Sequence, residues 1–453
     1  MTAPTSLATS RGTLAPMLRL AMPVLLEYLL HMVVIYSDTV LAGYYLGEAD
    51  LAAISVLYYA IWLVENMFGV VSIGTAALVA RFVGAGDWAL ARRVTCQSLA
   101  AGGVLSSLVV AVVVAGAPLF FSAVQMEGES ARLATHYLWI VALAVPCMMV
   151  EIVAVAALRG AGDTVTGLIV MGIVDLVNLA VSWSLVTGWG PFPELGWYGL
   201  AIGTTTAHLA GGLLLIWLLA RGRAGLKLQA GSLRPDMTVI RRILRIGIPG
   251  GTDVLLIILC HMWFLGIINS LGDLATAAHG VGVKIEGLAY LPGTAFQVAA
   301  ATMIGQFLGA GDHRRAARGV LTSVLAGGAV MSAVGALFFL FPEPLVRLFV
   351  SARQEEVIEM TVPLLQVVAF STPPLAVLMI VGGALRGAGD TRVPLMLNLL
   401  GFLGVRIPGA YLLAHVVGLG LIGAWYAMVG DVVIRCLFMV VRFRLGAWKR
   451  VTV

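Results

Sequence analysis

Charged side chains stand inside several long apolar stretches of this chain, where an ionised group is costly and therefore suggests a function. They are Glu27, Asp38, Glu65, Glu151 and Asp175 in the first half, and Asp253, Glu286, Arg406, Asp431 and Arg435 in the second. Burial or a like-charged neighbour favours the protonated form of a carboxyl group, so such acids can exchange protons. Together with other oxygen ligands they can also bind a sodium ion. The chemistry that these residue types predict is therefore ion exchange.

Asp38 is the acid that we favour most. Helical steps of 100° place Glu27, His31 and Asp38 on one face, where they could form a chain of titratable groups. The alternative is that Asp38 lies on the surface near the outer end of its helix. For Asp431 and Arg435, the i, i+4 spacing predicts that the two side chains pair with each other.

The composition shows what must position these residues. The chain has 453 residues, of which 60% are hydrophobic and 11% are charged, against about a quarter charged in soluble domains. This balance argues against a soluble enzyme, a nucleic-acid-binding protein and a disordered chain. The net charge of +5 is small, and the four cysteines stand apart, so neither a disulfide framework nor a metal centre is expected.

Apolar runs and their charged breaks predict an all-α membrane protein with twelve transmembrane helices. The predicted ranges are 15–43, 51–81, 94–120, 131–158, 164–187, 197–220, 240–269, 274–307, 315–341, 356–385, 392–416 and 419–442.

The connections between these ranges alternate between basic and acidic or neutral. Both ends of the chain fall in the basic set, so the positive-inside rule predicts cytoplasmic termini. We expect a multi-pass protein of the bacterial inner membrane. Residues 237–245 alternate apolar and basic faces, which leaves open whether they lie on the membrane surface or form part of a plain loop.

An internal duplication organises the chain. Ala157-Leu-Arg-Gly-Ala-Gly-Asp-Thr164 recurs unchanged as Ala384-Leu-Arg-Gly-Ala-Gly-Asp-Thr391, and Phe82-Val-Gly-Ala-Gly-Asp87 recurs as Phe307-Leu-Gly-Ala-Gly-Asp312. We therefore expect a six-helix bundle over 1–220, a cytoplasmic linker over 221–239 and a second six-helix bundle over 240–453. Two parallel repeats of this kind predict a cleft between the halves near the midplane. We interpret the arginines and aspartates of the repeated turns as structural, since they can pair or cap there.

These motifs resemble the multidrug and toxic compound extrusion (MATE) family over essentially the whole chain. Besides the repeated turns, the resemblance includes Ile35-Tyr-Ser-Asp-Thr-Val-Leu-Ala-Gly43, Ala277-Ala-His279 and Gly418-Leu-Gly-Leu-Ile-Gly-Ala-Trp425. In that family the aspartate of the first motif, here Asp38, takes part in cation coupling. The resemblance implies a transporter that is not an enzyme and that needs no cofactor beyond H⁺ or Na⁺.

The family pattern also suggests which residues couple transport to the ion. Asn178 matches a family asparagine, and Thr204 is the best match on the next helix, although Thr205 and Thr206 stand beside it. A family aspartate is replaced by Ser182. The complete predicted coupling set is Asp38, Glu151, Asp175, Asn178, Thr204 and Glu27, with a sodium ion at Asp38 and Asn178 as one possibility. Buried polar groups that only hold helices together are the alternative.

The second half departs from one branch of the family. Ile257 stands where that branch has a glutamate, and Asp253 lies four residues after Pro249, as Glu27 lies four after Pro23. Glu286 is expected to contact substrate or to pair with Arg406.

A cleft with carboxylates, aromatic rings and methionines suits amphipathic organic cations. The predicted substrate-binding residues are Tyr58, Trp62, Glu65, Met67, Asp253, Met262, Trp263, Glu286 and Tyr290. Packing, or a belt at the membrane interface, is the alternative explanation for the aromatic residues. We expect a monomeric antiporter, driven by protons or sodium, that exports such cations by alternating access through the lipid bilayer, with no nucleic-acid partner. A flippase for a lipid-linked oligosaccharide of the same superfamily is the alternative.

Overall fold

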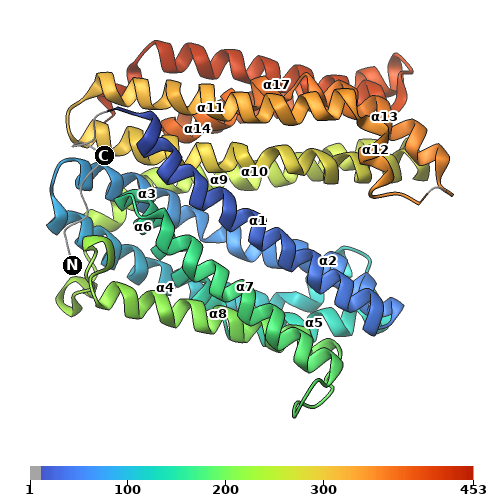
Figure 1. Cartoon of the computed structure of the whole chain (residues 1–453), viewed down its shortest axis with the longest axis horizontal. Helices are drawn as coiled ribbons and strands as arrows, with labels where there is room; N and C mark the ends of the chain where they lie inside the picture. Colours follow the sequence, from blue (N-terminus) through green and yellow to red (C-terminus); the bar gives the residue numbers. More distant parts are fainter. Residues whose placement is uncertain (1–11, 352, 452–453) are drawn as a thin grey trace. The chain divides into compact units, whose positions relative to one another are not determined.

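The computed structural model describes residues 12–351 and 353–451 and consists of helices joined by short connections (Figure 1). The first helices are α1 (Leu14–Tyr45), α2 (Glu48–Met67), α3 (Gly69–Gly84), α4 (Trp88–Ala123), α5 (Gly128–Ala142), α6 (Val145–Ala161), α7 (Thr164–Thr187) and α8 (Trp197–Ala220). Two short 3₁₀ turns, η2 (Arg223–Gly225) and η3 (Ala230–Leu233), follow.

The remaining helices are α9 (Met237–Asn269), α10 (Asp273–Gly309), α11 (His313–Leu340), α12 (Pro342–Arg347), α13 (Glu355–Ala369), α14 (Thr372–Gly387), α15 (Arg392–Gly401), η4 (Phe402–Arg406), α16 (Ile407–Tyr411), η5 (Leu412–Val416), α17 (Gly420–Arg444) and η6 (Ala447–Arg450). Of these, η4 and η5 are π-helical turns, and together with α15 and α16 they form one continuous span, Arg392–Val416.

Within the described residues, eight helices are long and apolar enough to cross a membrane, or up to eleven if three bent helix pairs each count as one span. The predicted all-α membrane fold is thus confirmed. The bent pairs are α2 with α3 (43°), α5 with α6 (61°) and α13 with α14 (55°). They replace three ranges that the sequence predicted as single helices. Pro146 and Pro373 stand in the first turn of α6 and α14, where proline suits a helix start but cannot continue a preceding helix.

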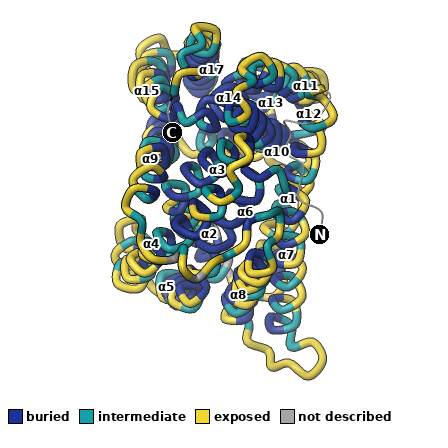
Figure 2. Tube along the Cα trace, turned by 90° about the vertical axis from the view of Figure 1, so that its left-hand side faces the viewer, coloured by how far each residue is buried: buried dark blue, intermediate teal, exposed yellow. Residues whose placement is uncertain are grey.

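The chain divides into two compact units, and α1 and α9 each contribute to both. The first unit contains Leu26–Gly251, and the second contains the described residues up to Leu25 together with those from Thr252 onward. Met17, Leu20 and Ala21, from the first turns of α1, accordingly belong to a buried cluster with residues of α10, α11, α14 and α17. Figure 2 shows buried segments inside the units and exposed segments on the outer sides of helices such as α4, α5 and α8.

The repeated Gly-Ala-Gly-Asp turns end one helix and begin the next. Gly86, Gly162, Gly311 and Gly389 all have positive φ angles, between 74° and 91°, which glycine adopts without strain. In three of these turns the following aspartate caps the next helix, since its carboxylate accepts a hydrogen bond from the backbone N–H three residues later. The Arg315 side chain, which also bonds Asp312, holds the pKa of that carboxyl below its usual range.

Gln97 and Arg93 of α4 hold the connection between α8 and α9 in place through hydrogen bonds and an ion pair. The Gln97 amide donates to the carbonyls of Ser232 and Arg234 and accepts from the N–H of Asp236. Arg93 forms an ion pair with Asp236 at 2.6 Å. Residues 237–245 are the first turns of α9, with Ile243 buried and in contact with α3. They therefore do not form a separate surface helix.

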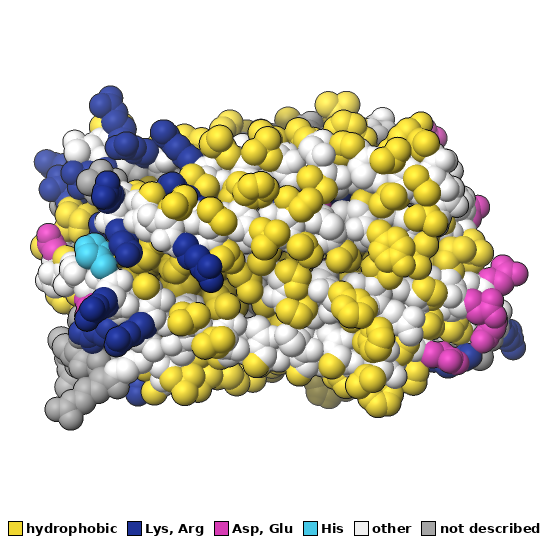
Figure 3. All heavy atoms as spheres, turned by 90° about the horizontal axis from the view of Figure 1, so that it is seen from above, with side chains coloured by type: hydrophobic (Ala, Val, Ile, Leu, Met, Phe, Trp, Pro, Cys, Tyr) yellow, Lys and Arg dark blue, Asp and Glu magenta, His cyan; other side chains and the backbone are white. Residues whose placement is uncertain are grey.

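Basic and acidic side chains gather at opposite ends of the helices on the face shown in Figure 3, with hydrophobic side chains between them. Many large apolar residues of the long helices are exposed, for example Val104, Leu119 and Leu213 at 77%, 74% and 62%. An apolar belt of this kind fits contact with lipid.

Candidate functional site

All six predicted coupling residues are buried in the first unit, at 3–7% exposure. They are Glu27 and Asp38 on α1, Glu151 on α6, Asp175 and Asn178 on α7, and Thr204 on α8. The structure does not join them into one network. It distributes them among three sets of contacts.

The first set contains Asp38. Its Oδ2 lies 3.5 Å from the donating hydroxyl of Tyr58 on α2, and its Oδ1 is buried with no hydrogen-bond partner among the described residues. Asn178 donates to the hydroxyl of Thr204 at 3.2 Å, and Thr204 also bonds the Tyr137 hydroxyl at 2.8 Å. Tyr137 is the member of this chain of bonds that lies within electrostatic range of Asp38. The Asn178 Oδ1 likewise has no partner in the described part of the chain. Asp38 and Asn178 therefore each offer a buried oxygen that a cation or a proton could use.

Thr204 is the threonine of the Thr204–Thr206 run that takes part in these contacts. Thr205 bonds backbone carbonyls of Ala201 and Ile140, and Thr206 is exposed. Tyr137 on α5 was missed by the sequence analysis. Its signal is weak, because a single tyrosine in an apolar helix more often packs than binds.

Glu27 forms the second set, with a partner that the sequence did not suggest. Its Oε1 accepts a hydrogen bond from Arg159 at 2.6 Å. Arg159 belongs to the repeated Leu-Arg-Gly-Ala-Gly-Asp-Thr turn, so this pair ties α1 to the end of α6.

The second unit repeats this arrangement. Arg386, from the other copy of the turn, donates to Asp253 at 3.0 Å, and Asn398 donates to the same carboxylate at 2.6 Å. The turn arginines thus pair with acids on α1 and α9. The two turn aspartates pair elsewhere, Asp163 with Arg223 and Asp390 with Arg442.

The third set consists of two histidine–carboxylate pairs. His208 on α8 lies 2.7 Å from Glu151, and His31 on α1 lies 3.4 Å from Asp175. The sequence placed His31 in a chain of titratable groups with Asp38. His208 was missed, because one histidine in an apolar helix carries no motif.

A buried network in the second unit centres on Asp431. Its carboxylate accepts from Arg435 at 2.6 Å, as the i, i+4 spacing predicted, and from Arg406 at 2.9 Å. The Phe402 ring lies against both guanidinium groups, at 4.4 and 4.8 Å from ring centroid to Cζ. Two guanidinium groups thus share one carboxylate as their counter-ion, and we interpret this directly bonded network as a structural element.

Glu286 on α10 stands outside this network. It is 6% exposed and forms neither a hydrogen bond nor an ion pair with any residue that the structure describes. Arg406 lies within electrostatic range of it, but the direct pair that the sequence allowed is not formed.

The other predicted substrate-binding residues lie on three helices. Tyr58, Trp62, Glu65 and Met67 are on α2, Met262 and Trp263 on α9, and Tyr290 on α10. Four of the apolar ones are exposed at 38–58%, namely Trp62, Met67, Met262 and Trp263. Asp253, in contrast, is 1% exposed, and its carboxylate accepts hydrogen bonds from Arg386 and Asn398.

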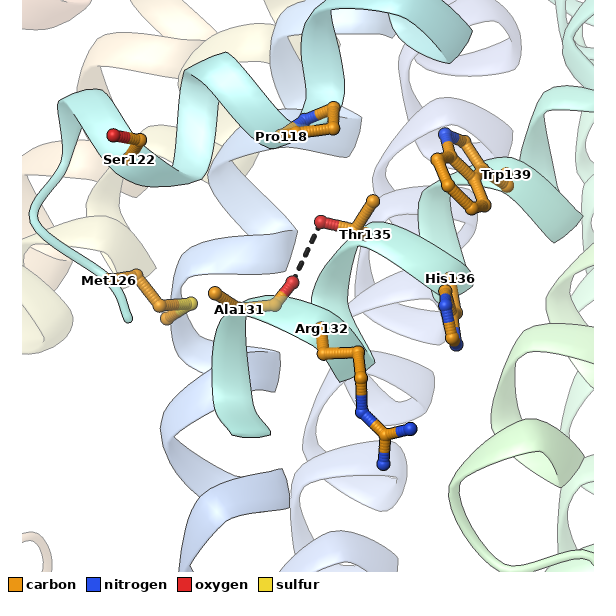
Figure 4. Close-up of a pocket in the computed structure, with 8 residues that line it drawn as sticks. All are labelled: Pro118, Ser122, Met126, Ala131, Arg132, Thr135, His136 and Trp139. Atoms are coloured by element: carbon orange, nitrogen blue, oxygen red, sulfur yellow. Dashed lines mark hydrogen bonds between the residues drawn. The ribbon is translucent and has the colours of Figure 1, made fainter. Parts of the chain in front are cut away.

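A pocket of about 350 Å³ lies between α4 and α5 in the first unit (Figure 4). It is lined by Pro118, Ser122, Met126, Ala131, Arg132, Thr135, His136 and Trp139. None of these eight residues was predicted from the sequence to belong to a site. Among the described residues, no group of three His, Cys, Asp or Glu side chains could hold a metal ion.

Solved structures of helical transporters share this fold. One is titled an outward-facing conformation of a multidrug resistance MATE family transporter of the MOP superfamily. It aligns with a TM-score of 0.92 at 19% identity, covering 99% of each chain. Another, from Pyrococcus furiosus, has the same score and identity, and its title states that a reverse polarity of the binding pocket suggests a different function. At this level of identity the likeness shows the fold alone.

Spanning helices in two units, with acid–base pairs buried inside them, define a helical membrane transporter. The MatE family model matches residues 23–184 and 249–412. This chain therefore belongs to the MatE family, that of the multidrug and toxic compound extrusion transporters.

Relatives in several bacteria cover nearly the full length. The chain is 28% identical over 444 residues to a probable multidrug resistance protein NorM of Thermotoga maritima, which covers 96% of this chain and 93% of the relative. It is 29% identical over 451 residues to one of Bradyrhizobium diazoefficiens, covering 96% and 94%. The multidrug resistance protein MdtK of Pectobacterium atrosepticum is 26% identical over 434 residues, covering 94% of each.

Proposed function

We propose that this protein exports amphipathic organic cations in exchange for protons or sodium ions, by alternating access. The observation that carries the proposal is the pair of buried oxygens without partners, Asp38 Oδ1 and Asn178 Oδ1, in the interior of the first unit. An uncompensated carboxylate in such a place is costly, so a proton or a cation at Asp38 lowers the free energy of the protein. The names of the relatives support drug-like substrates.

Whether a proton or a sodium ion drives transport depends on which of the two Asp38 binds. A proton needs only the carboxylate, whereas a sodium ion at Asp38 and Asn178 needs several oxygens around it. Thr204 and Tyr137 are the hydroxyl groups nearest to Asn178 in its hydrogen-bond chain. Besides the coupling ion, we expect no cofactor.

Glu65 and Glu286 are the carboxylates that we assign to substrate. Neither forms an ion pair with a lysine or arginine among the described residues, so each can attract an organic cation. Asp253 is a weaker candidate than its sequence position suggested, because Arg386 and Asn398 already occupy its oxygens. The exposed aromatic and methionine side chains on α2 and α9 can contact the apolar parts of substrates that differ in shape.

The proposed setting is the bacterial inner membrane, with both termini in the cytoplasm and the protein acting as a monomer. The basic connections that alternate with acidic or neutral ones along the chain support this orientation.

Resistance of a host cell tests the substrate class. In a bacterial strain that lacks its own efflux pumps, we expect expression of this protein to raise resistance to several chemically unrelated cationic dyes and drugs. The measurement is the minimum inhibitory concentration for a broad panel, with a Glu65→Gln, Glu286→Gln double variant of equal expression as the control. Resistance to no member of the panel, at confirmed membrane expression, would favour the lipid-linked oligosaccharide flippase instead.

A further inference from the structure

The contact between α6 and α8 is built around one acid and one imidazole. Gly211 and Gly212 on α8 leave room for α6, because a Cβ at Gly211 would meet the Glu151 carboxylate and a Cβ at Gly212 would lie 2.6 Å from that of Cys147. One turn before these glycines, His208 Nδ1 bonds Glu151 at 2.7 Å. The two side chains are 12% and 3% exposed. The small glycines thus allow α6 and α8 to approach closely, and this approach buries the His208–Glu151 pair inside the unit.

A second pair lies close to the first. His31 Nδ1 lies 3.4 Å from Asp175, and the His31 side chain is 44% exposed. Glu65 on α2 is within electrostatic range of both imidazoles and of Glu151. We name these five residues, His31, Glu65, Glu151, Asp175 and His208, the paired cluster.

The charges of the paired cluster do not balance without protons. It contains three carboxyl groups, and no lysine or arginine among the described residues bonds to any of them. With both imidazoles neutral and all three acids ionised, the net charge would be −3 in an apolar lobe, which is prohibitively costly. Two imidazolium ions reduce it to −1, so the cluster must hold protons, and the histidines are the groups that can exchange them near neutral pH.

We propose that the paired cluster is a second proton-exchange site, separate from Asp38, whose two histidines together release one proton when a singly charged organic cation binds at Glu65. A cation at Glu65 and two nearby imidazolium ions repel each other. The form of the cluster with both histidines protonated therefore disfavours the form with a cation bound at Glu65. The N–H bond that breaks leaves its electron pair on the ring nitrogen, and the proton passes to water. The bound cation replaces the lost positive charge.

Other charged and titratable groups surround the cluster. The neighbouring elements contribute Glu27, Tyr28 and Asp38 from α1, Tyr58 from α2, Tyr137 from α5, and Cys147 and Arg159 from α6. Arg159 is the fixed positive charge among them, and it is held by Glu27. The proton count on dye binding is therefore governed by His31, His208 and Asp38.

Proton release on binding tests the proposal. It rests on the proposed function, because it assumes that an organic cation is the ligand. Ethidium and tetraphenylphosphonium suit the test, since their charge is permanent and they release no protons themselves. Purified protein in weakly buffered detergent at neutral pH is titrated with each cation, and a pH-indicator dye counts the protons released per cation bound. We expect the His31→Asn, His208→Asn double variant to release about one proton fewer per cation bound than the wild type, and each single variant to release fewer protons than the wild type.

The control is His136→Asn on α5, which lies outside the cluster and should release as many protons as the wild type. His208→Asn retains a side-chain N–H for Glu151, and His31→Asn changes a half-exposed position, so at least one variant should fold. Proton release equal to that of the wild type in the folded double variant, or in both folded single variants, with the cation still bound, would overturn the proposal. Failure of the wild type to bind either cation would instead contradict the proposed function. Proton release without gradient-driven transport would contradict only the export mechanism.

Discussion

At the scale of single residues, the acids divide into those with a fixed partner and those without. Glu27, Asp253 and Asp431 each bond an arginine, whereas Asp38 and Glu286 bond no cation that the structure describes. A fixed ion pair keeps both charges in place through a transport cycle. An acid without such a partner can change its proton or its ligand, and for this reason coupling and binding are assigned to the second group.

The Asp431 network gives a prediction about stability. Asp431→Asn leaves Arg406 and Arg435 buried beside each other without their shared counter-ion. We expect a loss of about 3–5 kcal/mol, as for breaking a buried ion pair. This should be seen as a large drop in apparent melting temperature in detergent and as low expression. Glu355→Gln, which loosens the exposed pair with Arg347, is the matched control, and we expect little change in its melting temperature because exposed ion pairs contribute little to stability. Equal melting temperatures for the two variants would contradict this account.

At the scale of helices, the sequence predicted which segments are helical but not where they bend. Pro146 and Pro373 stand at breaks, yet Pro23, Pro249 and Pro292 lie inside continuous helices. A proline therefore permits a break, and the contacts of the neighbouring helices decide whether one occurs. The turn motifs were more informative, because a glycine with positive φ and an aspartate cap follow from local chemistry.

Glycines that allow helix contact give the prediction at this scale. Gly211→Ala would place a methyl group against the Glu151 carboxylate and Val174, which are both buried. We expect lower thermal stability and weaker efflux, because α6 and α8 must separate. Gly116→Ala on α4 is the matched control, since a Cβ there meets nothing within 4 Å, and removing a helical glycine should stabilise by about 0.5–1 kcal/mol. The comparison needs thermal melts and dye efflux of both variants, and a Gly211→Ala protein as stable and active as Gly116→Ala would refute the assignment.

At the scale of the whole molecule, the duplication was readable because matched turns recur at nearly constant spacing. It also related Glu27 to Asp253 by their positions after a proline. Their partners, Arg159 and Arg386, lie 132 and 133 residues away from them in the chain, and no local pattern reveals contacts of that length. The histidine pairs were hidden for the same reason. Sequence patterns thus predict the spans and the buried acids, whereas the pairing of those acids depends on how the helices pack.

The central claim is that ion exchange at Asp38 drives the export of organic cations, and transport in proteoliposomes tests it most directly. Wild-type protein, Asp38→Asn and Glu286→Gln are reconstituted, and ethidium transport is followed under an imposed proton gradient and, separately, a sodium gradient. We expect one of the gradients to drive transport by the wild type. Asp38→Asn should bind ethidium but show no gradient-driven transport, and Glu286→Gln should lose affinity more than coupling. Transport by Asp38→Asn at the wild-type rate under the driving gradient would contradict the claim.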